Sequence, residues 1–193
     1  LAAEWLSRDE SFWQGIFRLV AAHRLVVNSS GLKITQYWSP EPVPDFDYAN
    51  VDEFAAHYRW LLEDTTSRLS RSSAALGCEV SGGLDSSALY AVADNLQKQG
   101  RFLSPALRGY TLAFEGDVEA NELAYSRAVA RHLGCNIQEV IPTRTSVDWC
   151  VQFARRYRQF VPYPNGLMAL DIRKAAQRDG CRALLVGVGG DEW

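Results

Sequence analysis

Cysteine is scarce in this chain of 193 residues, and its four cysteines are widely separated. None forms a Cys-x-x-Cys pair, so the sequence predicts reduced thiols rather than a disulfide framework or a zinc site. Basic residues do not outnumber acidic ones, and the formal net charge of −3 argues against a nucleic-acid partner. No apolar run has the length of a membrane span, and no signal peptide is visible. We therefore expect a cytoplasmic protein without a membrane partner.

A proline-rich stretch at residues 39–50 is the predicted linker between two unequal parts. Before it, residues 24–38 alternate apolar and polar side chains around Asn-Ser-Ser-Gly, which predicts a β-hairpin. Because two strands alone are marginally stable, residues 1–38 are expected to be the end of a larger domain. The chain begins at Leu1 without a methionine and stops directly after a glycine-rich turn, so we expect a fragment of a longer protein.

Residues 51–193 alternate predicted helices and strands, beginning with a helix for which Asn50 is the candidate cap. This alternation is typical of an α/β fold with a parallel sheet and helices on both faces. Ligands of such sheets bind at the edge where the strands end. The predicted strands span residues 74–78, 107–114, 136–141 and 182–187, and the later helices span 86–100, 123–133, 146–160 and 167–178.

Residues 81–87, the phosphate loop, read Ser-Gly-Gly-Leu-Asp-Ser-Ser between a predicted strand and a predicted helix. The glycines let a ligand approach the backbone, and a helix start presents free N–H groups and a positive dipole end. The segment therefore suits a phosphate group, and a Mg²⁺ ion would explain the carboxylate of Asp85 beside it. It has no lysine, which excludes a Walker-type loop. The competing interpretation is a tight turn whose serines only cap the helix.

A second glycine-rich motif, Gly-Val-Gly-Gly-Asp-Glu at residues 187–192, follows the last predicted strand. Parallel strands end at a common edge of the sheet, so this motif and the phosphate loop are expected to converge. Asp191 could then join Asp85 in an oxygen-ligand site for one Mg²⁺ ion. The alternative is a glycine-rich turn with a solvated acidic pair.

The phosphate loop resembles the pyrophosphate loop of the ATP-pyrophosphatase superfamily, whose members cleave ATP to AMP and pyrophosphate. Residues 187–192 resemble the Ser-Gly-Glu-Gly-x-Asp-Glu segment of the asparagine synthetases. Residues 110–114 and 122–134 are similar to the strand and helix that follow the loop in that family. The resemblance implies that a carboxylate is activated as an acyl-adenylate and converted to an amide. It identifies residues 51–193 as a truncated synthetase domain.

Residues 1–38 resemble the end of the glutaminase domain that precedes such a synthetase domain. In asparagine synthetases this domain releases ammonia from glutamine, and the ammonia attacks adenylated aspartate. The main prediction is therefore a glutamine-hydrolysing asparagine synthase. The implied partners are ATP, Mg²⁺, ammonia and a carboxylate substrate, either aspartate or a peptide. The resemblance is also compatible with a homodimer.

Roles for individual residues follow from the same resemblance. Asp85 and Asp191 would hold the metal ion, and Asp191 and Glu192 would take part in the chemistry. The residues expected to bind the nucleotide are Val80, Ser81, Gly82, Gly83, Leu84, Asp85, Ser86, Ser87, Leu112, Val186 and Gly187.

One departure from the family pattern keeps alternatives open. Val188 stands where asparagine synthetases carry a glutamate, and a valine can neither transfer a proton nor bind a metal. Enzymes altered in this region form intramolecular amides, as lasso-peptide macrolactam synthetases and β-lactam synthetases do, and this is the second hypothesis. The third is a catalytically silent relative that binds nucleotide.

Overall fold

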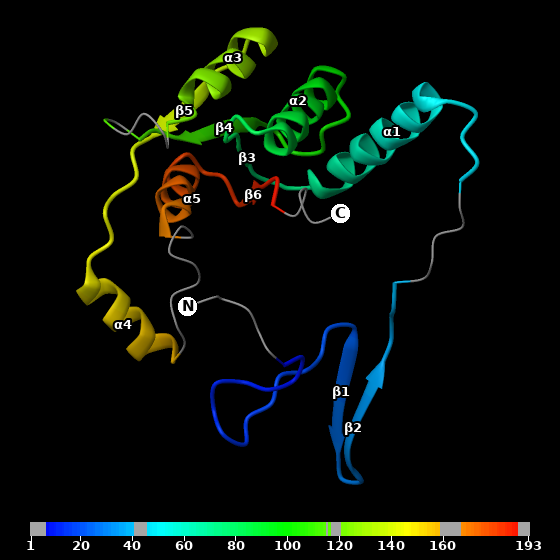
Figure 1. Cartoon of the computed structure of the whole chain (residues 1–193), viewed down its shortest axis with the longest axis vertical. Coiled ribbons are helices and arrows are strands. Elements are labelled where there is room, and N and C mark those ends of the chain that lie inside the picture. Colours follow the sequence, from blue (N-terminus) through cyan, green and yellow to red (C-terminus); the bar gives the residue numbers. More distant parts are fainter. Residues whose placement is uncertain (1–6, 41–45, 115, 117–120, 159–166, 189–193) are drawn as a thin grey trace.

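Two β-structures organise the chain in the computed structural model, which describes residues 7–40, 46–114, 116, 121–158 and 167–188. One is an antiparallel hairpin and the other is a four-stranded parallel sheet with helices (Figure 1). The predicted α/β fold and the predicted hairpin are both confirmed. No helix in the described ranges is long and apolar enough to cross a membrane.

The hairpin consists of β1 (His23–Asn28) and β2 (Gly31–Gln36). The turn between them is supported by Asn28, whose side-chain oxygen accepts a hydrogen bond from Ser30 N at 2.9 Å. This is the local bonding that makes asparagine common in turns. Most of the apolar side chains of the hairpin are exposed, for example Val27 at 68%. The hairpin lies apart from the parallel sheet in Figure 1.

The parallel sheet has the order β5 (Ile137–Val140), β4 (Leu107–Leu112), β3 (Leu76–Glu79), β6 (Ala183–Leu185). All three pairings are parallel, and in the register Leu76 of β3 lies between Leu107 of β4 and Ala183 of β6. The strand that leads into the phosphate loop is therefore flanked on both sides. All four strands end at one edge of the sheet, as the alternating sequence pattern predicts.

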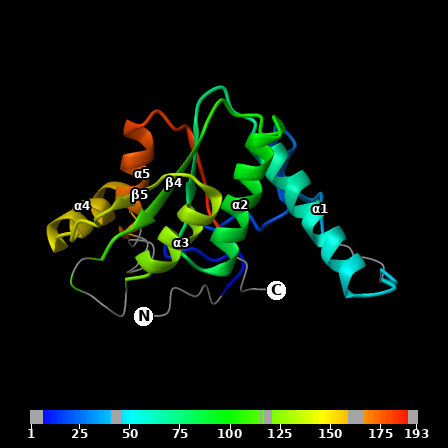
Figure 2. The same cartoon turned by 90° about the horizontal axis from the view of Figure 1, so that it is seen from above.

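Helices cover both faces of this sheet (Figure 2). One face carries α2 (Leu84–Lys98) and α3 (Leu123–Leu133), and the other carries α5 (Ala169–Arg178). Two further helices are α1 (Val51–Leu69), which packs on α2, and α4 (Val147–Tyr157). The cores of the two faces are built from the buried side chains Cys78, Val80, Tyr90 and Ile137 under α2 and α3, and Tyr110, Ile172, Ala175 and Ala176 under α5.

Local sequence sets several helix ends. Asn50 caps α1 as predicted, because its side-chain oxygen accepts from Glu53 N at 2.9 Å. Helix α3 ends at Leu133 and is followed by Gly134, which adopts the left-handed conformation with φ of 65°. Helix α2 begins at Leu84, two residues earlier than the apolar pattern predicts, because the backbone of Gly83 already takes the N-cap position.

Candidate functional site

The phosphate loop connects the central strand β3 to helix α2. It leaves the sheet through Val80, which is fully buried and whose N–H donates to Tyr110 O at 2.7 Å. The chain then turns at Gly82, with φ of 94°, a conformation that side chains other than glycine rarely adopt. The loop thus starts from a rigid strand in the interior of the sheet and opens at the edge where ligands of α/β folds bind.

Serine hydroxyls hold the loop in shape. The side-chain oxygen of Ser86 accepts a hydrogen bond from Ser81 N at 3.1 Å and lies 2.9 Å from Ser81 Oγ. Ser81 Oγ in turn accepts from Gly83 N at 3.3 Å. Ser86 is buried, so its hydroxyl stabilises the loop from inside, whereas Ser81 is exposed. Ser87 Oγ is buried and has no hydrogen-bond partner among the described residues.

Gly82 is packed against the first turn of α3. A Cβ atom at this position would lie 2.7 Å from Tyr125 Cβ and 3.2 Å from Glu122 O, so no side chain fits there. The positive φ and this close approach both require glycine. The sequence predicts a glycine for ligand approach, and the structure adds the contact with α3, which motif reading did not reveal.

Gly187, at the end of β6, lies against the start of α2. A Cβ atom on Gly187 would be 2.8 Å from Ser86 N and 3.2 Å from Asp85 C. The two glycine-rich segments, about a hundred positions apart in the sequence, therefore touch at the edge of the sheet. The predicted convergence of the two motifs is confirmed as far as Gly187.

Asp191 and Glu192 lie outside the described residues, so their placement beside Asp85 stays a prediction. Asp85 is in the first turn of α2 and is exposed, as is its neighbour Leu84, whose exposed fraction is 91%. Within the described ranges, no group of three or more His, Cys, Asp or Glu side chains is arranged to hold a metal ion. The metal site is therefore a prediction as well.

The N-terminus of α2 is electrostatically suited to an anion. Gly83 occupies the N-cap position and no described side chain caps this helix. The first N–H groups of a helix have no intrahelical acceptor, and the helix dipole places a partial positive charge among them. An anion bound at the mouth of the loop would accept hydrogen bonds from these N–H groups.

Three apolar residues predicted to contact adenosine differ in exposure. Val80 is fully buried under α2 and α3, so its side chain is not available to a nucleotide. Leu112 is partly buried against the core under α5. Val186 is 42% exposed at the end of β6, and beyond it Val188 is 86% exposed. Their contacts with a nucleotide remain predictions.

Motif reading missed a carboxylate next to the phosphate loop. Glu79 is the last residue of β3, lies opposite Tyr110 in the register and is half-buried. Burial raises the pKa of Glu79, and the positive charge of Arg173 opposes this only in part. A charged residue inside an otherwise apolar strand is the sequence signal that could have identified it. Its neighbour Cys78 is fully buried in the core under α2 and α3, and burial raises the pKa of that thiol to about 12.

Comparison with known proteins supplies the family. The family model described as asparagine synthase matches residues 57–193. Amidase chry2 of Gibberella zeae and Amidase chyE of Penicillium rubens are 27% and 25% identical to the chain, each over 97% of its length. Asparagine synthetase (glutamine-hydrolyzing) 3 of Bacillus subtilis is 33% identical over 53% of the chain. The chain spans only 30%, 30% and 16% of these three proteins, respectively. The family match covers more than half of the sequence, and the chain therefore belongs to the asparagine synthase family.

Proposed function

We propose that this chain is the ATP-binding part of an enzyme that converts a carboxylate to an amide through an acyl-adenylate. The observation that carries the proposal is the contact between Gly187 and the start of α2. It joins the phosphate loop and the second glycine-rich motif into one cradle at the edge of the sheet. Membership of the asparagine synthase family supports this reaction class.

The geometry of the loop supports binding of the ATP phosphates. The first N–H groups of α2 would donate hydrogen bonds to the β- and γ-phosphates, and the exposed hydroxyl of Ser81 would add a donor. Fixed donors of this kind stabilise the charge that develops on departing pyrophosphate, because they need no rearrangement during the reaction. The hydrogen bonds between Ser81, Gly83 and Ser86 keep the donors in place.

The donor set fits a Mg²⁺ ion in one respect: Asp85 presents an exposed carboxylate at the mouth of the loop. We propose that Asp85 and Asp191 hold the ion. When bound, it would neutralise charge on pyrophosphate and act as a Lewis acid. Glu192 is proposed to act with Asp191 at the acceptor side.

The proposals for the acceptor and the nitrogen source are inferred from the family resemblance. Aspartate is the acceptor of an asparagine synthase, and a peptide carboxylate is that of the intramolecular amide-forming enzymes. Ammonia from a glutaminase domain, a homodimer and a cytoplasmic location are part of the same proposal. Val188 supports an acceptor other than aspartate, because it provides no carboxylate beside the loop.

Amide hydrolysis is a second candidate, favoured by the two fungal relatives that are named amidases and align over 97% of this chain. A hydrolase has no use for a pyrophosphate-binding cradle, since water attacks an amide without ATP. The requirement for ATP therefore separates the two candidates.

The test is ATP–pyrophosphate exchange by the full-length protein with Mg²⁺ and a panel of carboxylic acids. We expect exchange that depends on the acid, and we expect Asp85→Asn to reduce it at least about a hundredfold by removing a metal ligand. Asp52→Asn is the matched control, because Asp52 lies in the first turn of α1, far from the loop in sequence, and should leave exchange unchanged. Ammonia release from amides without ATP would instead support hydrolysis. A protein that binds no nucleotide with any acid would contradict the amide-forming proposal.

A further inference from the structure

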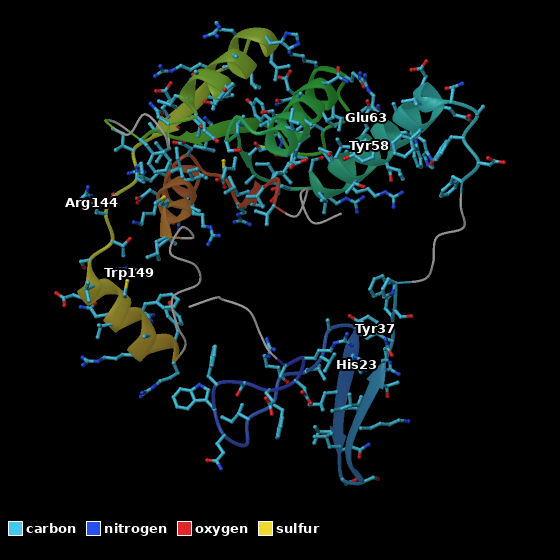
Figure 3. The ribbon with its side chains drawn as sticks, viewed as in Figure 1. His23, Tyr37, Tyr58, Glu63, Arg144 and Trp149 are labelled. Carbon is cyan, nitrogen blue, oxygen red and sulfur yellow. The ribbon has the colours of Figure 1, made fainter. Side chains whose placement is uncertain are left out.

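A cavity of about 220 Å³ lies outside the phosphate loop, between the segment that follows β5 and helices α4 and α5. Figure 3 shows two of its residues, Arg144 on that segment and Trp149 in α4. The strands of the sheet end at one edge, and β5 is two positions from β3. The cavity and the phosphate loop therefore both follow strands that end at the same edge of the sheet. It is lined by Thr143, Arg144, Thr145, Ser146, Trp149, Leu167, Leu170, Asp171 and Lys174.

Asp171 connects two walls of the cavity by hydrogen bonds. Its Oδ2 accepts a hydrogen bond from Thr143 N at 2.6 Å, which ties the segment after β5 to α5. Its Oδ1 accepts from Lys174 Nζ at 3.0 Å. Burial raises the pKa of Asp171, but the hydrogen bonds from Thr143 and Lys174 outweigh it and the net pKa is lowered. Asp171 therefore stays ionised and pairs with Lys174, and each of its oxygens accepts one hydrogen bond.

One cation in the lining is left without a counter-charge. Arg144 is exposed and makes no ion pair with any residue in the described part of the chain. A guanidinium presents donors that match a carboxylate, and such a charge-assisted pair is among the stronger hydrogen-bonded contacts in proteins.

The lining also has an apolar part beside the polar side chains of Thr143, Thr145 and Ser146. The backbone N–H of Trp149 donates to Ser146 Oγ at 3.1 Å, which caps α4, and the Trp149 ring stacks on Phe153 with centroids 5.3 Å apart. Leu167 and Leu170 complete the apolar lining. An engineered apolar cavity of about 150 Å³ accommodates benzene, so this one has room for a ring and a carboxylate.

We infer that this cavity binds the acceptor and that the acceptor is a small carboxylate with a flat, apolar body rather than aspartate. The apolar body would lie against Trp149, Leu167 and Leu170, and the carboxylate would pair with Arg144 at the side of the sheet edge. Aspartate fits poorly, because its body offers little apolar surface to Trp149, Leu167 and Leu170, and the one carboxylate among the described lining residues, Asp171, already pairs with Lys174. The inference that the bound acid is the acceptor rests on the proposed amide-forming function.

Binding is tested first, without ATP, on the full-length protein by ligand-observed NMR and calorimetry with benzoate and 3-phenylpropionate. We expect both acids to bind and aspartate and neutral benzamide to bind at least about tenfold more weakly, because each lacks one of the two contacts. Arg144→Ala should weaken benzoate binding about tenfold, whereas Arg131→Ala, which removes an exposed cation from α3, should not. Trp149→Phe keeps an aromatic wall and should retain binding. Equal binding of aspartate and benzoate, or no effect of Arg144→Ala, would overturn the inference.

Adenylation is tested second, by ATP–pyrophosphate exchange with the same acids. We expect Arg144→Ala to raise the KM of the acid about tenfold and to leave the KM of ATP unchanged. If the acids bind through Arg144 but no acid supports exchange, the cavity is a carboxylate site and the proposed function is wrong. If exchange occurs only with aspartate and is insensitive to Arg144→Ala, the proposed function stands and the acceptor site is wrong.

Discussion

Replacing Gly187 by alanine adds one methyl group where the segment after β6 meets the phosphate loop. The loss of unfolding free energy can be worked out from the structure. The new Cβ would lie 2.8 Å from Ser86 N and 2.9 Å from Ser86 Cα, which are backbone atoms that no rotamer change can move. Reaching an ordinary contact of 3.4 Å requires the two segments to separate by about 0.6 Å. Overpacking of this kind costs about 1–3 kcal/mol of unfolding free energy. At about 2–4 °C per kcal/mol, Tm should fall by about 2–12 °C.

Gly83→Ala is the matched control, since it adds the same methyl group two residues before Asp85 on the same loop. Its Cβ would meet nothing closer than Ser81 Oγ at 3.4 Å, and the φ of Gly83 is −68°, so the substitution should change stability by less than about 1 kcal/mol. Thermal unfolding and ATP–pyrophosphate exchange of both full-length variants separate the two effects. Gly187→Ala should lower Tm and raise the KM of ATP about tenfold or more, because small displacements in a site are costly. An unchanged Tm for Gly187→Ala, or an equal loss for Gly83→Ala, would refute the steric argument.

Three further outcomes are expected. Gly82→Ala should lower Tm more than Gly187→Ala does, because the new Cβ meets Tyr125 at 2.7 Å and the φ of 94° is itself unfavourable for alanine; thermal unfolding measures both. Tyr110→Phe removes the hydrogen bond from the buried hydroxyl to Asp179 Oδ2 at 2.8 Å and should cost about 1.5–3 kcal/mol in denaturant unfolding. Burial raises the pKa of Glu79, so the folded chain holds this proton at pH values where the unfolded chain has lost it, and stability should fall as the pH rises from the ordinary carboxyl pKa through the raised one. Glu79→Gln should flatten that part of the profile of Tm against pH, and a profile parallel to that of the unsubstituted protein would contradict the assignment.

Much of the fold could be predicted because its signals are local. The alternation of apolar segments with capped helices predicted the strands, the parallel sheet and the cap at Asn50, and these are confirmed. Strand ends were placed less accurately. Residues 107–114 were predicted as one strand, whereas the β-ladder ends at Leu112, because apolar residues continue past the last paired residue. The pattern of apolar side chains indicates which residues are buried. Which residues form backbone pairs depends instead on the length of the neighbouring strand.

The site could be predicted only where its residues form a contiguous sequence motif. The phosphate loop was found from its glycines and serines, whereas the packing of Gly82 on Tyr125 depends on where α3 begins in space. The cavity at Arg144 and Trp149 was missed for the same reason, since Asp171, which closes it, is 28 positions from Thr143. Contacts between distant segments leave no periodic trace in a sequence.

The central position of β3 has a consequence for folding. Leu76 pairs with Leu107 on one side and with Ala183, which is 107 residues further along the chain, on the other. Pairings of such long sequence separation close large loops, which slows folding. During synthesis β3, which leads into the phosphate loop, emerges before β6 and keeps one unpaired edge until β6 has been made. The part of the protein proposed to grip the nucleotide is therefore completed only after β6 has been made, and until then that edge is open to other strands.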